Sequence, residues 1–184
     1  MRTLRLLLPL VLATLPLAPA LAADSGIVVV RHAEKADDGT RDPGLTSAGH
    51  ERAQKLAEAL DQADVGGLIA SQYQRTQQTL AVLAAKRNLE VTIVPAEPGS
   101  DIEEHIRALV SQVEASRAEG LLVIAGHSNT VPLIVEALTG KTVGTISESD
   151  YDRMYLLLPD DAGMDVIFSR YGAADEAAAG SPAE

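Results

Sequence analysis

The chain has 184 residues, of which 46% are hydrophobic, 22% charged and 3% aromatic, a composition that excludes a disordered or collagen-like chain and fits one globular domain. Its 15 Lys and Arg oppose 26 Asp and Glu, for a net charge of -11, which argues against a nucleic-acid partner because such proteins need a basic face. The absence of cysteine excludes disulfides, thiolate metal sites, cysteine nucleophiles and lipoprotein acylation.

The first 22 residues have the pattern of a secretory signal peptide. Arg2 and Arg5 precede an apolar stretch at 6–17, and Ala20-Leu21-Ala22 supplies a small–x–small cleavage motif. The apolar stretch is shorter than the roughly 20 residues that a membrane-spanning helix needs, so we expect no stable membrane anchor. The sequence therefore predicts an exported protein, either secreted or periplasmic.

Strand-like and helix-like segments alternate along the rest of the chain. Short apolar runs are typical of buried parallel strands, and apolar residues spaced three and four apart indicate the helices between them. In chain order we expect a strand at 27–30, a helix at 46–60, a strand at 68–70, a helix at 75–87, a strand at 91–94, a helix after Ser100, a strand at 121–125, a helix from about Pro132 to Gly140, and a hairpin of 154–158 and 164–168. This alternation predicts a single α/β domain over residues 23–171, a three-layer α/β/α sandwich with a mostly parallel central sheet. Residues 172–184 are expected to form a disordered acidic tail.

Several polar residues are expected to cap these helices. Thr46 is the expected N-cap of the first helix, and Ser100 with Glu103 has the spacing of a capping box at the start of the third. Ser128 and Asn129 are expected to cap the fourth helix and also to donate hydrogen bonds to a bound substrate.

Cationic residues follow three of the expected strands. Arg31 and His32 come directly after the first strand, Arg75 follows the second, and His127 follows the strand at 121–125. Ligands of open α/β sheets bind where strands end, and arginine side chains and helix N-termini suit phosphate. Taken singly, each residue has an ordinary structural interpretation, such as a solvated sheet edge or a helix cap. Their coincidence at strand ends favours a phosphate site.

The motifs around these residues resemble those of the histidine phosphatase superfamily, in particular the phosphoglycerate-mutase-like phosphatases of its first branch. The similar segments are Arg-His-Ala-Glu at 31–34, Leu-Thr-Ser-Ala-Gly at 45–49, Ser-Gln-Tyr-Gln-Arg-Thr-Gln-Gln-Thr at 71–79 and Gly-His-Ser at 126–128. The chain departs from the family pattern at two places. Ala33 stands in place of the usual glycine, which is a small change, and Ser-Asn follows His127 in place of the aspartate of second-branch acid phosphatases.

The resemblance implies a mechanism. His32 is the implied nucleophile and would form a phosphohistidine that water then hydrolyses, while Arg31, Arg75 and His127 would hold the phosphoryl oxygens. We expect no metal and no cofactor, because the four histidines show no ligand-like spacing. His50 and His105 are interpreted as structural.

The proton donor for the leaving group is less well defined by the sequence. In the family it is usually a carboxylate after the strand that precedes the third helix, and Glu97 is our first choice there. Asp101 is the alternative from the same loop, although a role at the helix N-terminus suits it better. Glu34 is a weaker candidate, because we expect it to bind Arg31 or Arg75.

The sequence favours an exported, metal-independent phosphomonoesterase, a histidine acid phosphatase-like phosphoric monoester hydrolase. Expected substrates are a phosphorylated small molecule, an envelope sugar or a phosphoprotein. One alternative is a catalytically silent phosphate-binding protein of the same fold. A phosphomutase is another, but it favours a large lid, and the connections at 32–45 and 95–100 are short.

Overall fold

A computed structural model describes residues 26–96, 101–116, 119–161 and 163–174. Its strands are β1 (Ile27–Arg31), β2 (Val65–Ala70), β3 (Val91–Ile93), β4 (Leu121–Gly126), β5 (Arg153–Asp160) and β6 (Gly163–Arg170). Its helices are α1 (Ser47–Ala59), α2 (Gln74–Arg87), α3 (Ile102–Ala115) and α4 (Val131–Thr139). The expected signal peptide lies outside the described residues, as does the expected tail apart from 172–174.

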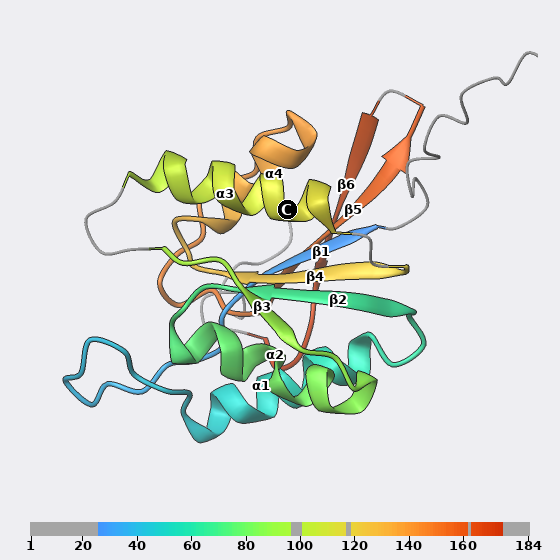
Figure 1. Ribbon diagram of the computed structural model, residues 1–184. Helices are drawn as coiled ribbons and strands as arrows, with labels where there is room; N and C mark the ends of the chain where they lie inside the picture. Colours follow the sequence, from blue (N-terminus) through green and yellow to red (C-terminus); the bar gives the residue numbers. More distant parts are fainter. Residues whose placement is uncertain (1–25, 97–100, 117–118, 162, 175–184) are drawn as a thin grey trace, which may run out of the picture.

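The strands form one sheet in the order β3-β2-β4-β1-β5-β6. The first four in this order are parallel, whereas β5 pairs antiparallel with β1, and β6 antiparallel with β5. Helices α1 and α2 cover one face of the sheet, and α3 and α4 cover the other (Figure 1). The predicted three-layer α/β domain with a mostly parallel sheet is confirmed.

The central strands are apolar because helices bury both of their faces. Within β1, Val28 and Val30 pack into the core on the α1/α2 side, and Ile27 and Val29 pack into the core on the α3/α4 side. Among the described residues, no helix is long and apolar enough to span a membrane. Two packed faces hold β1 and β4 rigidly, and the functional residues follow the ends of these strands.

The second strand is longer than its apolar run suggests, since β2 begins at Val65 rather than at residue 68. The sequence did not indicate this start because Gly66 interrupts the run of β-branched residues that is typical of a strand. A Cβ atom built on Gly66 would lie only 1.7 Å from the Glu119 carbonyl oxygen, so the close backbone approach requires glycine.

Helix caps are confirmed in part. Thr46 Oγ1 accepts from the Gly49 N–H at 3.1 Å, as expected of an N-cap. The expected Ser100 cap is wrong: Asp101 caps α3 and accepts from the Glu103 N–H at 3.1 Å, while Ser100 lies outside the described residues. A stronger acceptor one position along the chain serves the helix start.

Candidate active site

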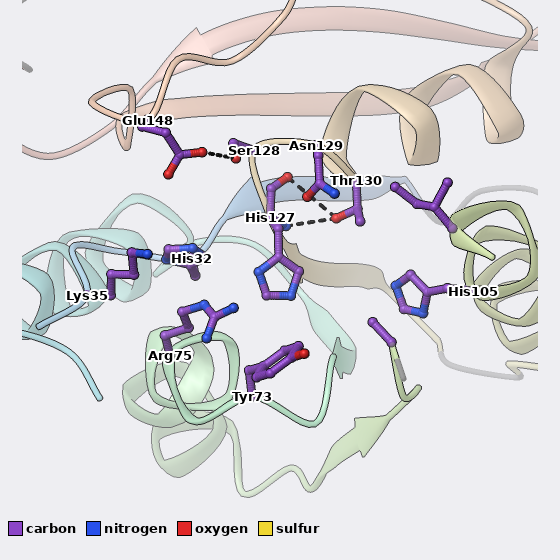
Figure 2. A pocket seen from close by; sticks show the side chains of 12 residues that line it. His32, Lys35, Tyr73, Arg75, His105, His127, Ser128, Asn129, Thr130 and Glu148 are labelled. Carbon is purple, nitrogen blue, oxygen red and sulfur yellow. Dashed lines mark hydrogen bonds between the residues drawn. The ribbon is translucent and has the colours of Figure 1, made fainter. Parts of the chain in front are cut away.

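The parallel strands deliver the predicted residues to one edge of the sheet. Arg31 pairs in register with Gly126, so His32 and His127 follow neighbouring strand ends. Their ring centroids are 5.4 Å apart with an interplanar angle of 64°. A cavity of about 360 Å³ opens here, and its wall includes His32, Arg75 and His127 (Figure 2).

His32 is held in the tautomer that a nucleophile needs. Its Nδ1 lies 2.7 Å from the Ala33 carbonyl oxygen, which can only accept, so Nδ1 carries the proton and Nε2 keeps its lone pair. The His32 N–H also donates to the Gly126 carbonyl at 2.9 Å. Burial lowers the pKa of His32 to about 3, with a further contribution from the positive charges of Arg31 and Arg75. The ring is therefore neutral near pH 7.

His127 is fixed from two sides. Its Nε2 lies 2.9 Å from Ser71 Oγ, and its main-chain N–H donates to Thr130 Oγ1 at 2.8 Å. The Tyr73 ring meets the imidazole edge-on at 5.4 Å. Burial lowers the pKa of His127 to about 3, and electrostatic repulsion from His32 and Arg75 contributes to the lowering. The segment after β2 thus positions the histidine that follows β4.

Arg31 is almost fully buried, with 1% of its surface exposed, and a single loop holds its guanidinium. Nη1 donates to the carbonyls of Ser147 at 2.7 Å and Asp150 at 3.1 Å, and Nη2 donates to Glu148 Oε2 at 3.1 Å. The guanidinium also lies 4.1 Å from the Tyr151 ring centroid. Its Nε is buried and has no partner among the described residues.

Arg75 is held more loosely in the first turn of α2. Its guanidinium lies over the Tyr73 ring at 4.3 Å, and Nη1 is 3.8 Å from Asp42 Oδ1. Burial lowers the pKa of the guanidinium from its ordinary value. Its Nε is also buried and without a partner among the described residues. Because Arg75 lines the cavity, a bound ligand would relieve the cost of leaving this buried N–H donor without a partner.

The structure brings most of the predicted site residues together. His32, Arg75, His127, Ser128 and Asn129 line the cavity, whereas the buried Arg31 does not. The positive charge of Arg31 still acts on the site electrostatically, because it contributes to the lowered pKa of His32. A direct contact between Arg31 and a substrate stays a prediction.

The predicted caps of α4 are wrong. The N-cap of this helix is Thr130, which makes no side-chain capping bond. Ser128 instead donates to Glu148 Oε1 at 2.6 Å (Figure 2). A hydroxyl beside a carboxylate forms a charge-assisted bond, which is stronger than an ordinary cap.

The structure places two of the three candidate proton donors, Glu34 and Asp101, in other roles. Glu97, the first choice, lies outside the described residues. The expected partners of Glu34 are wrong, since its Oε1 accepts from Nε and Nη2 of Arg52, at 2.9 and 2.7 Å. Asp101 caps α3, as its expected role at a helix start implies. The identity of the proton donor therefore stays a prediction.

Sequence reasoning missed several residues of the cavity wall. Glu148 and Lys35 both line it, and no local pattern marks either one. His105, interpreted as structural, is buried and lies within hydrogen-bond distance of the Pro95 carbonyl through Nδ1, at 2.9 Å, but its ring also lines the cavity. Tyr73 lies inside the 71–79 motif, so that motif could have identified it. In the described part of the chain, no cluster of three or more His, Asp or Glu side chains could hold a metal ion.

Comparisons with known proteins agree with this geometry. Residues 27–96 match the model of the histidine phosphatase superfamily (branch 1), while no curated protein matches the sequence. The solved structure of the protein histidine phosphatase SixA complexed with tungstate has a TM-score of 0.60 at 20% identity, covering 79% of this chain and 95% of that one.

A mycobacterial glucosyl-3-phosphoglycerate phosphatase, solved with VO3, has a TM-score of 0.60 at 15% identity, covering 82% of this chain and 100% of that one. At such identities these likenesses show a shared fold. Together with the family model, which matches residues 27–96, they agree with the resemblance that the motifs carry to the histidine phosphatase superfamily, branch 1.

Proposed function

We propose that this protein is a phosphomonoesterase that works through a phosphohistidine at His32. The observation that carries the proposal is the convergence of His32, Arg75 and His127 on one cavity, with the Nδ1 proton of His32 already held by the Ala33 carbonyl. A phosphoryl group in this cavity would accept hydrogen bonds from Arg75, whose Nε–H is without a partner among the described residues, and guanidinium groups bind phosphoryl oxygens well.

The chemistry follows from these groups. His32 Nε2 attacks phosphorus, the N–P bond forms, the ester P–O bond breaks, and the leaving oxygen takes a proton from an acid, for which we propose Glu97. Water then attacks the phosphohistidine, which breaks the N–P bond and releases phosphate. Arg31, Arg75 and His127 oppose the negative charge that the phosphoryl oxygens carry during both steps.

Two of the similar solved structures contain an oxyanion, which supports an anionic substrate. SixA was solved with tungstate, and the mycobacterial phosphatase with VO3; tungstate has the four tetrahedral oxygens of phosphate, and VO3 has the three oxygens of a phosphoryl group in transfer. We propose a phosphorylated small molecule, an envelope sugar or a phosphoprotein as substrate. We also propose that catalysis needs no metal, and that the protein is exported, on the strength of the signal-like pattern at residues 1–22.

Hydrolysis of para-nitrophenyl phosphate between pH 4 and 9, with and without vanadate and EDTA, tests the proposal. We expect turnover that vanadate inhibits and EDTA leaves unchanged, and no turnover above background for His32→Ala, because that variant lacks the attacking nitrogen. Near-wild-type activity of His32→Ala would refute the mechanism. Vanadate binding without turnover would instead favour a silent anion-binding protein, and loss of activity in EDTA with recovery in zinc would refute metal independence.

A further inference from the structure

Glu148 holds a fixed negative charge at the mouth of the cavity. It belongs to the loop between α4 and β5, and its two carboxylate oxygens have different partners. Oε2 accepts from Arg31 Nη2 at 3.1 Å, and Oε1 accepts from Ser128 Oγ at 2.6 Å. The side chain is 75% exposed, yet these two bonds tie it to the last residue of β1 and to the segment that follows β4.

The carboxylate also stands between two cavities. Glu148 lines the cavity of about 360 Å³ that contains His32 and His127, and it lines a second cavity of about 530 Å³ beside the 35–43 loop and Tyr151. Figure 2 shows Glu148 across the opening from Arg75. A leaving group that extends from the phosphoryl site into the second cavity therefore passes close to this carboxylate.

Glu148 stays ionised near neutral pH. The hydrogen bond from Ser128 holds the pKa of its carboxyl below the usual range, and the charge of Arg31 contributes in the same direction. An ionised carboxylate cannot give a proton to a leaving group. Its effect on a substrate is therefore electrostatic.

We propose that Glu148 is a specificity-determining residue, which disfavours substrates that carry a second anionic group beside the scissile phosphate. The substrate class is then a phosphomonoester of an uncharged alcohol, and this inference rests on the function proposed above. Two oxygens that accept from the same guanidinium nitrogen lie about 5 Å apart. A phosphoryl oxygen bound to the other Nη2 hydrogen of Arg31 would therefore lie at about this distance from Glu148 Oε2, and a further anionic group of the same substrate would lie near the Glu148 carboxylate. Repulsion at such a distance is appreciable even in a partly solvated site.

Lys35 lines the same two cavities and has the opposite charge. Its ammonium group makes no hydrogen bond or ion pair with the described residues, whereas two bonds fix the carboxylate of Glu148. A mobile, hydrated ammonium group interacts less with a bound ligand than a fixed charge does. Glu148 is therefore the fixed negative charge that both cavities share.

Glycerol 3-phosphate and 3-phosphoglycerate test the proposal, because they differ mainly by a hydroxymethyl group in place of a carboxylate. The measurement is the ratio of kcat/KM for the two compounds, with inhibition constants against para-nitrophenyl phosphate as a second readout. We expect the wild type to prefer glycerol 3-phosphate, and Glu148→Gln to reduce that preference roughly five- to tenfold, through faster reaction of 3-phosphoglycerate. In 1 M NaCl the wild-type preference should shrink, because salt screens an exposed charge.

Glu58→Gln is the matched control. Glu58 is an exposed carboxylate on α1 that pairs with Lys55, and its variant should keep the wild-type ratio. A Glu148→Gln ratio within twofold of wild type would overturn the proposal. An equal change for both compounds would do so too, because Glu148 would then only orient Arg31. If neither glycerol 3-phosphate nor 3-phosphoglycerate is hydrolysed or inhibits the enzyme, the specificity proposal is also wrong. The proposed phosphatase function would still stand if para-nitrophenyl phosphate is hydrolysed by the wild type and not by His32→Ala.

Discussion

Arg31 and Arg52 are both buried arginines at the same end of this protein, but their surroundings differ. Arg52 binds Glu34 through Nε and Nη2, and its Nη1 donates to the carbonyls of Tyr171 and Ala173, each at 3.0 Å. Arg31 is anchored by one loop and keeps its buried Nε–H without a partner in the described structure. Arg52 joins α1 to the chain after β6, whereas Arg31 lies at the end of β1, next to His32, and is held by the loop that contains Glu148.

Burial of a charged side chain does not by itself mark a functional site, since Arg52 and Arg31 are both buried. The donors of a structural arginine such as Arg52 form hydrogen bonds within the protein. Removing the arginine or its carboxylate partner leaves the other buried group without a partner. An unpartnered Nε does not by itself mark a ligand site either, because Arg87 and Arg153 also have one among the described residues. Arg75 is distinguished by its place, since it lines the cavity together with His32 and His127.

The largest expected effect separates Arg75 from Arg52 by activity. Arg75→Ala should lower kcat for para-nitrophenyl phosphate by roughly 10²–10³-fold, the usual loss for one donor to a charge that develops in the transition state. Steady-state kinetics on the folded variant measures this loss. Activity within tenfold of the wild type would place Arg75 outside the site.

The second prediction concerns stability. Arg52→Ala should lower the free energy of unfolding by about 3 kcal/mol, because Glu34 loses its ion pair and two carbonyls lose their donor. The kcat of the fraction that remains folded should stay near the wild-type value. Urea unfolding together with kinetics measures both quantities, and a hundredfold loss of kcat would erase the distinction between Arg52 and Arg75.

A third prediction concerns anion binding. Vanadate at about 100 times its Kd should stabilise the folded protein by about 2.7 kcal/mol, which raises Tm by about 5–10 °C for a chain of this size. Arg75→Ala should lose most of this gain, and Arg52→Ala should keep it from its lower starting Tm. An equal gain in both variants would argue against a role for Arg75 in anion binding.

The smallest expected effect is a dependence of stability on pH. Burial holds the pKa of His32 and His127 at about 3, below the value of about 6.5 in an unfolded chain. The unfolded state therefore binds more protons than the folded state below pH 6.5, and stability falls as pH falls from 6.5 towards 3. Between pH 7.5 and 5.5 each histidine should account for about 1 kcal/mol of this loss.

His127→Gln tests that contribution. Its loss of unfolding free energy between pH 7.5 and 5.5, measured by urea titration without phosphate, should be about 1 kcal/mol smaller than that of the wild type. An identical loss in both proteins would show that His127 accepts a proton in the folded state as easily as in the unfolded chain.

Much of the fold was predictable because its signals are local. Apolar runs predicted the central strands, and the positions of Arg31, His32 and His127 at strand ends predicted their convergence, since parallel strands end at one edge of the sheet. The start of β2 was missed because Gly66 is selected by a close backbone approach and carries no strand propensity.

The partners of charged groups were less predictable. Glu34 was expected to bind Arg31 or Arg75, and it binds Arg52 instead, because α1 brings that guanidinium beside the loop after β1. Glu148 reaches the site from a loop 20 residues after Ser128, and no spacing in the sequence indicates such a contact. Residues that act through tertiary placement alone need the folded chain to reveal them.

The most direct test of the account is the phosphorylation of His32 itself. The protein is mixed with labelled substrate, quenched under alkaline conditions that preserve phosphohistidine, and digested, and the label is mapped by mass spectrometry. We predict transient, acid-labile phosphate on the peptide that contains His32, with none in His32→Ala. Rapid turnover with no label on His32, or with the label on another residue, would contradict the account.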